Sequence, residues 1–486
     1  MCDVADKQRR IQFCNTGCVS SWLYIDEEYG TSVRHANIQQ QRDVYRLSWL
    51  QMDLIAGITV GLTTVPQSLA YAEVVGLPPQ YGLYSAFMGG FIYCIFGTSK
   101  DVVLGPTAIM SLLCAPHVGH HPGHAVLLTF LCGVIQVITS LLRLGFLLDH
   151  ISDPVIKGFT CAAAVTIGFG QMKNILGIGE VPQQFLMQVY YTLLKVPEAR
   201  LGDVVMGLLC LCTLVILSGR KIPAGSEDHP TSSRWIQSLI WGLVTARCVL
   251  VVVGATCVVY VSEAWGYKPF TITGETSQGL PPVKPPPFSE TTSNGTVISF
   301  SQIAQSLQGG LVIIPIMGLL ESIAIAKAYA GQNDYRIDTN QEIFAIGLTN
   351  ILGSFVSSYP VTGSFGRSAV NSQTGVCTPA GGVVTGTIVL LSLAFFMPLF
   401  HYIPKASLAV VIICSVAPMA DYRVVRDLWQ IRSLDLLPFL VTFVISFWQV
   451  PHGILGGVIV SGMLNIYKRS KFLHTPLKTL GNSQNI

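Results

Sequence analysis

The sequence predicts an all-α polytopic membrane protein with fourteen transmembrane segments. Half of the 486 residues are hydrophobic and only 11% are charged, whereas roughly a quarter of the residues of a soluble globular protein are charged. Apolar stretches close to the roughly 20 residues that a helix needs to cross a bilayer recur along the chain. Lysine and arginine concentrate in every second turn between these stretches, as they do in cytosolic loops.

The segments can be placed in order from the amino terminus. Residues 1–50 carry Lys7, Arg9 and Arg10 without the apolar core of a signal peptide, so we expect a cytosolic tail there. Two pieces, 106–115 and 364–375, are too short to span alone, and 154–195 is expected to be a bent pair of helices that counts as one crossing. The expected crossings are 52–72, 80–97, 106–115, 125–145, 154–195, 201–219, 238–262, 308–330, 341–358, 364–375, 380–400, 404–420, 434–450 and 452–468.

The charge pattern tests this count. With the amino terminus inside, the opposite turns are nearly bare, except for Lys173, Lys195 and Arg200 around the bent segment. The polar, proline-rich loop 263–307 then lies outside, and its Asn294-Gly295-Thr296 triplet is an N-glycosylation acceptor in the right compartment. Both chain ends are expected inside. The expected cytosolic turns carry Lys100, Arg143, Arg220, Lys221, Arg234, Arg336, Arg423, Arg426 and Arg432.

Several classes of function are disfavoured by the residues. A net charge of +3, without a basic run, argues against a nucleic-acid partner. The 13 cysteines form no CxxC pair, so we expect small buried residues and no metal centre or other cofactor. The sequence has no Walker-type nucleotide motif and no pair of catalytic side chains within a span, so no catalytic residue and no enzyme is predicted. Histidines in one outside turn could bind metal or sense pH, but a solvated loop is the favoured interpretation; they are His117, His120, His121 and His124.

A hidden repeat divides the chain in two. QSLAYAE (67–73) aligns with ESIAIAK (321–327), which pairs Gln67 with Glu321. LGPTAIMS (104–111) aligns with FGRSAVNS (365–372), which pairs Thr107 with Ser368. The two matches occur in the same order, at separations of 254 and 261 residues. A repeat of seven crossings is odd in number, so the second copy must be inverted in the membrane.

The inverted repeat explains a charge inside an apolar half-chain. The short pieces 106–115 and 367–375 follow glycine-containing extended stretches, so we expect half-helices 3 and 10, whose amino-terminal ends meet near the midplane. Each end carries about half a positive charge, and Arg367 adds a full charge and up to five donors. An anion is therefore expected between them. Gly105 and Gly366 would leave the backbone uncovered there, and the hydroxyl groups would come from Thr107 and Ser368.

Two further groups are expected at this site. Gln67 and Tyr71 lie one helical turn apart, so both can face the anion, although ordinary helix packing is the alternative. Glu321 could compensate Arg367 or carry a coupled proton. In the competing interpretation, Arg367 and Glu321 form only a structural ion pair that ties two helices together.

The same residues carry a family resemblance. YAEVVGLPPQYGLYSAF (71–87) and FGTSKDVVLGPTAIMSLL (96–113) resemble the signature of the sulfate permease anion transporters, solute carrier family 26. The resemblance covers roughly 46–468 and implies a seven-plus-seven inverted repeat in which a core domain moves like an elevator against a gate domain. The implied domains are the core at 51–145 and 308–400, the gate at 146–262 and 401–468, and a tail at 469–486 that lacks the family's soluble STAS domain.

The resemblance also implies a site and an activity. Gln67, Tyr71, Thr107, Gly366 and Arg367 match positions that bind the anion in the family, and Glu321 matches an acidic position linked to proton movement. The expected activity is sodium-independent secondary transport of sulfate, with chloride, bicarbonate or oxalate as candidate exchange partners. The alternatives are a purine or uracil permease and a non-transporting truncated subunit. We expect a homodimer in the plasma membrane or the endolysosomal membrane.

Overall fold

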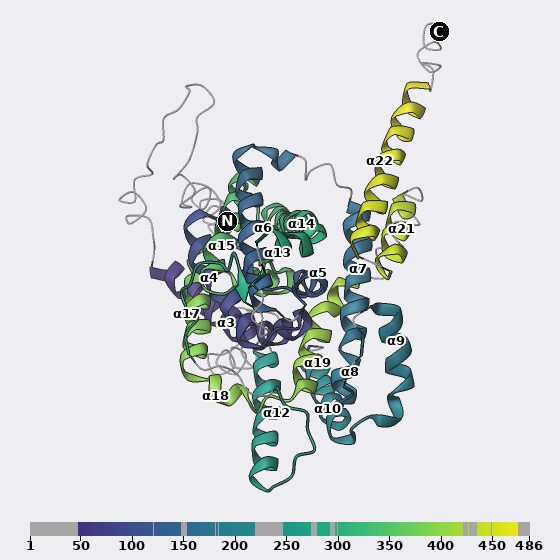
Figure 1. The fold of residues 1–486 in the computed structure, drawn as a ribbon. Coiled ribbons are helices and arrows are strands. Elements are labelled where there is room, and N and C mark those ends of the chain that lie inside the picture. Colours follow the sequence, from purple (N-terminus) through teal and green to yellow (C-terminus); the bar gives the residue numbers. More distant parts are fainter. Residues whose placement is uncertain are drawn as a thin grey trace, which may run out of the picture.

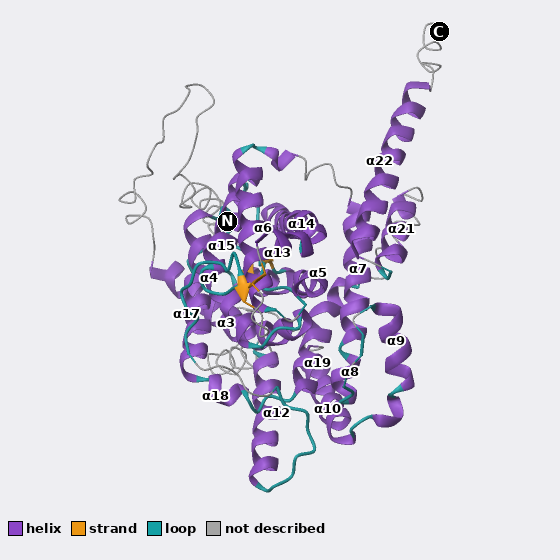
Figure 2. Ribbon diagram, in the orientation of Figure 1, coloured by secondary structure: helices purple, strands orange, loops and turns teal. Residues whose placement is uncertain are grey.

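The computed structural model describes residues 47–119, 121–146, 153–179, 181–182, 184–218, 246–273, 279–291, 297–298, 300–420, 426, 435–448 and 450–474. Helices dominate these residues, with two small pairs of strands among them (Figure 2). Five helices are long and apolar enough to cross a membrane: Trp49–Val75, Pro122–Leu141, Pro154–Leu176, Arg247–Ala264 and Gly309–Gln332. Shorter apolar helices accompany them, as expected for a chain with broken crossings.

Helices from both halves of the sequence form a first group. The late helix α17 packs against the early helices α3 and α4, the late helix α15 packs against α4 and α6, and α14 packs against α6 (Figure 1). This intermixing of distant segments is the arrangement that two repeats with a shared core would give. The members of the first group are α3 (Leu47–Val75), α4 (Gln80–Phe96), α5 (Ala108–Val118), α6 (Pro122–Leu141), α14 (Gln308–Gln332), α15 (Thr339–Ser354), α16 (Phe365–Thr374) and α17 (Gly381–Phe395).

A second group combines the remaining long helices. Within it, α21 packs against α7 and α22, and α19 packs against α8 and α10 (Figure 1). Its members are α7 (Asp153–Gly170), α8 (Met172–Leu176), α9 (Phe185–Leu194), α10 (Leu201–Ser218), α12 (Arg247–Ala264), α19 (Lys405–Val416), α21 (Leu436–Ser446) and α22 (Val450–His474). Short elements complete the described chain: η2 (Val196–Glu198), β2 (Glu290–Thr291), β3 (Val297–Ile298), α13 (Phe300–Ser306), α18 (Met397–Phe400) and η3 (Ala417–Met419).

The first group is held together by close backbone contacts. Helices α4 and α17 cross at Gly90 and Gly382, where a Cβ on Gly90 would lie 2.1 Å from the Gly382 carbonyl oxygen. Helices α3 and α17 cross at Gly57 and Gly381, where a Cβ on Gly57 would lie 2.5 Å from the Gly381 oxygen. Small residues permit this approach, which supplies van der Waals contact where lipid provides no hydrophobic driving force.

Two short strands set the origin of the half-helices. β1 (Leu104–Gly105) pairs antiparallel with β4 (Thr362–Gly363), with Leu104 opposite Gly363 and Gly105 opposite Thr362. Because the strands are antiparallel, α5 and α16 leave the pair in opposite directions, and their amino-terminal ends stay close together. The helix that carries Arg367 begins at Phe365, so Arg367 lies within its first turn and not at its first residue.

The predicted register of the second match is wrong by one helical turn. Thr107 is the residue before the first residue of α5, and the residue in the same position before α16 is Ser364. The alignment had instead paired Thr107 with Ser368. Serines recur four residues apart in this stretch, so a match based on small hydroxyl residues can slip by one turn.

The other predicted segments follow the helices with shifted ends. The bent segment 154–195 resolves into α7, α8 and α9, and the ten residues of α9 are too short to cross a bilayer. The predicted crossing 238–262 lies outside the described residues up to 245, and its described helix α12 continues to Ala264. Most of the tails 1–50 and 469–486 likewise lies outside the described residues.

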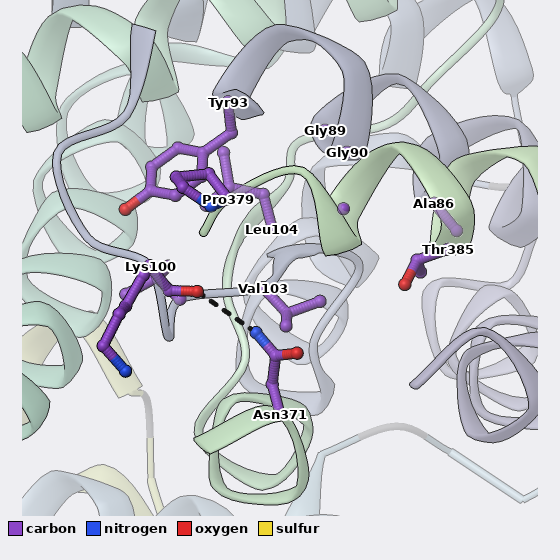
Figure 3. Close-up of a pocket in the computed structure, with 12 residues that line it drawn as sticks. Ala86, Gly89, Gly90, Tyr93, Lys100, Val103, Leu104, Asn371, Pro379 and Thr385 are labelled. Atoms are coloured by element: carbon purple, nitrogen blue, oxygen red, sulfur yellow. Dashed lines mark hydrogen bonds between the residues drawn. The ribbon is translucent and has the colours of Figure 1, made fainter. Parts of the chain in front are cut away.

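Helix α16 is anchored on the chain that leads into β1. Asn371 donates its side-chain amide to the backbone oxygen of Lys100 at 3.3 Å (Figure 3) and to that of Asp101 at 3.2 Å. A cavity of about 20 Å³ lies beside this contact, lined by Lys100, Val103 and Pro379 among others (Figure 3). That volume is about enough for one water molecule. The anchor fixes α16 on the segment that it must approach to place Arg367.

Candidate functional site

Arg367 is the largest of the fully buried side chains among the described residues, with only 1% of its surface exposed. One terminal nitrogen, Nη2, donates to the Pro106 carbonyl oxygen at 2.6 Å. The other two nitrogens, Nε and Nη1, have no hydrogen-bond partner among the described residues. A buried guanidinium with unused donors is costly unless an anion satisfies them.

Gly105 makes room for this guanidinium. A Cβ at this position would lie 2.9 Å from Nη1 of Arg367 and 3.1 Å from Nη2. Gly366, on the same helix as Arg367, has open space where its Cβ would be. The two glycines therefore differ: Gly105 accommodates the arginine, and Gly366 leaves the first turn of α16 uncovered.

The first turn of α5 faces Glu321. The Thr107 hydroxyl caps α5 by accepting the Met110 amide at 3.3 Å. The same hydroxyl donates to the Glu321 carboxylate at 3.4 Å. The described residues show no direct ion pair between Arg367 and Glu321, and the Glu321 carboxylate accepts the Thr107 hydroxyl instead, so the geometry does not favour the competing interpretation of a structural ion pair.

A cavity of about 630 Å³ opens where these groups meet. Its walls come from α3, α5, α14 and α16 of the first group, from α12 and α19 of the second group, and from the short helix η3. Six of the seven residues predicted from the sequence for the anion and its coupled proton line it: Gln67, Tyr71, Thr107, Glu321, Gly366 and Arg367.

Ser368 is the exception among these predicted residues. Its side chain is fully buried, and its hydroxyl accepts the backbone amide of Val103 at 3.0 Å. It therefore ties α16 to the chain before β1 and does not line the cavity. The predicted glycosylation site, Asn294, lies outside the described residues. The described residues contain no group of three metal-ligating side chains. Of the four histidines in the predicted outside turn, His120 lies outside the described residues.

The sequence did not reveal the wall that the second group contributes. Arg247 and Cys248 at the start of α12, and Cys414 and Ser415 near the end of α19, line the cavity. Ser415 accepts a hydrogen bond from the Gln67 side chain at 3.1 Å, across 348 positions of the sequence. No local pattern marks these residues, because they lie in ordinary apolar helices. Only Arg247, a charge within a predicted crossing, carried a signal comparable to that of Arg367.

A family model and several relatives match this chain. A model of the sulfate permease family matches residues 50–442. A sodium-independent sulfate anion transporter from Bos taurus is 57% identical over 420 residues, which are 86% of this chain and 70% of the bovine protein. Sulfate transporter 4.1, chloroplastic, from Arabidopsis thaliana is 36% identical over a match that covers 85% of this chain and 58% of the Arabidopsis protein. Sulfate permease 2 of Saccharomyces cerevisiae is 34% identical, and the chain spans about half of it.

Solved structures share the fold at low sequence identity. The murine Solute Carrier 26 family member A9 anion transporter, in an inward-facing state, has a TM-score of 0.73 at 22% identity, over 89% of this chain and 70% of its own. The transmembrane domain of the cyanobacterial bicarbonate transporter BicA has a TM-score of 0.64 at 19% identity, over 86% of this chain and 98% of its own.

Proposed function

The chain belongs to the sulfate permease family, and from this premise we propose that it carries sulfate across a membrane as a sodium-independent secondary transporter. Its relatives have transporter names, so the chain is an integral membrane transporter and not an enzyme, as its sequence predicted. The anion would bind in the cavity of about 630 Å³ between the two groups of helices.

The unused donors of Arg367 carry this proposal. An unpaired arginine at the centre of a spanning helix costs about 2.5 to 3.5 kcal/mol on insertion scales. Two of its three nitrogens lack a partner among the described residues, and the amino-terminal ends of α5 and α16 add partial positive charge beside them. A sulfate oxygen would satisfy the free donors, and the second negative charge of sulfate suits a site with one full and two partial positive charges.

The binding residues that we propose are Gln67, Tyr71, Thr107, Gly366 and Arg367, with Glu321 as the group that carries a proton. Ser368 is proposed only as a support for α16, because its hydroxyl is already used. We propose further that the first group of helices is the moving core and the second the gate, in a seven-plus-seven inverted repeat of fourteen crossings. The cavity between the two groups supports this division.

Sulfate flux into reconstituted vesicles tests the proposal. The purified chain should take up labelled sulfate without sodium, and a chloride, bicarbonate or oxalate gradient of opposite direction should drive the uptake if these anions exchange. Arg367→Ala in the same vesicles is the negative control. Uptake of uracil that sulfate does not inhibit would support the purine or uracil permease instead. Absence of flux in vesicles with correctly inserted protein would contradict the proposal and support a non-transporting subunit.

A further inference from the structure

Ser415, in the second group, accepts a hydrogen bond from Gln67, which is one of the donors of the proposed anion site. The Gln67 amide, on α3, donates to the Ser415 hydroxyl oxygen, on α19, at 3.1 Å. Tyr71 lies one turn further along α3, on the same wall of the cavity. Both α3 side chains line the cavity together with Ser415 itself. The Gln67 donor proposed to hold the anion is thus engaged by one atom of the opposite wall.

The geometry makes Ser415 an acceptor in this contact. Its own hydroxyl proton is donated to the Val411 carbonyl oxygen, one turn back on α19, at 2.7 Å. A hydroxyl whose proton is committed presents its lone pairs to other groups. The Ser415 oxygen therefore offers Gln67 what an anion oxygen would offer: an electron pair, but without the charge.

From this we infer that Ser415 is a stand-in acceptor, which holds the Gln67 donor against α19 and which the anion must displace. The inference rests on the proposed function, and it adds Ser415 as a residue that sets the apparent affinity for sulfate. When sulfate binds, the Gln67 donor has to leave Ser415 before it can reach a sulfate oxygen. The displacement also removes a hydrogen bond between the two groups of helices, so binding weakens the contact that holds them together.

Removal of the acceptor should therefore strengthen sulfate binding. Ser415→Ala keeps the helix and the volume but leaves Gln67 free for the anion, so we expect the KM for sulfate to fall about fivefold, equivalent to about 1 kcal/mol, without an increase in the maximal rate. Ser415→Thr retains a hydroxyl at this position and should keep the KM within about twofold of wild type. Initial uptake rates over a range of sulfate concentrations, normalised to inserted protein, measure both quantities.

Ser407→Ala is the matched control. Ser407 lies on the same helix, is fully buried and donates to the Pro404 carbonyl oxygen at 2.8 Å, but it does not line the cavity. If the wild type transports sulfate normally and Ser415→Ala has an unchanged or higher KM, the inference is wrong and the proposed function still stands. A wild-type chain that neither transports sulfate nor is stabilised by it against heat would overturn the proposed function instead. A purely structural role for Ser415 would lower the maximal rate or the protein yield without lowering KM.

Discussion

The Arg367 guanidinium donates from one nitrogen to a backbone oxygen of the protein, and its other two nitrogens have no partner among the described residues. Nη2 donates to the Pro106 oxygen, which fixes the guanidinium beside the start of α5, and Arg367 lines the cavity. Arg367→Lys would retain the charge but lose the planar arrangement of donors, so a single ammonium would have to serve both Pro106 and the anion. We expect sulfate uptake to fall at least tenfold in Arg367→Lys and to background in Arg367→Ala, measured as initial rates with surface expression matched by biotinylation.

Glu321 sets the charge of the cavity. When its carboxylate binds a proton, one negative charge leaves the cavity and the attraction for a divalent anion rises. Sulfate uptake by the wild type should therefore increase as the pH falls, whereas Glu321→Gln should remove this slope because the amide is neutral at every pH. The measurement is labelled sulfate uptake from pH 5.5 to 8. A slope in Glu321→Gln equal to that of the wild type would dismiss the coupling role.

Part of the site was predictable from single residues, and the reason is energetic. A full charge in an apolar stretch costs several kcal/mol, so Arg367 and Glu321 are conspicuous in the sequence without any structure. Ser415 costs nothing in a membrane helix, since its hydroxyl bonds to the Val411 carbonyl of its own helix, so nothing in the sequence marks it. Ser368 was placed at the anion site for a similar reason. A serine in the first turn of a helix can face the cavity or the chain that the helix packs against, and Ser368 faces the chain before β1.

At the scale of elements, the half-helices were foreseen but their origins were not placed correctly. The glycine-containing stretches before each piece indicated a break. The antiparallel pairing of Leu104–Gly105 with Thr362–Gly363 depends on a contact across more than 250 residues, which local pattern cannot supply. The pairing explains why α16 begins at Phe365, two residues before the predicted start.

The same pairing makes Gly105 a sharp test of the site. In Gly105→Ala the new Cβ would lie 2.9 Å from the Nη1 atom of Arg367, closer than real Cβ atoms approach. The guanidinium must move, so we expect sulfate uptake to fall at least tenfold while the protein still reaches the membrane. Gly279→Ala, where φ is also positive and a Cβ would meet open space, controls for the methyl group and for the backbone strain. Equal uptake in the two variants would contradict the placement of Arg367 against β1.

At the scale of the whole molecule, α3 and α19 form one of the contacts between the two groups of helices. The cavity end of this contact carries the bond from Gln67 to Ser415. Its other end carries an ion pair, in which the Lys405 ammonium lies 3.1 Å from the Glu73 carboxylate. Neither pair could be foreseen, because each joins segments more than 300 residues apart. The charge rule places the carboxyl end of α3 on the outer side, so the ion pair is expected there.

If the first group moves against the second during transport, a covalent link at this ion pair must stop the cycle. In the double variant Glu73→Cys and Lys405→Cys, a short, membrane-impermeant bifunctional reagent that forms mixed disulfides with thiols, applied outside, should join α3 to α19. We expect sulfate uptake to fall to background after linking and to recover when the link is cleaved by a reductant. Each single variant, treated in the same way, reports the effect of the reagent on one added thiol and on the 13 native cysteines. Uptake that continues in fully linked protein would mean that α3 and α19 stay together throughout the cycle, and the elevator proposal would then be wrong even if sulfate is the substrate.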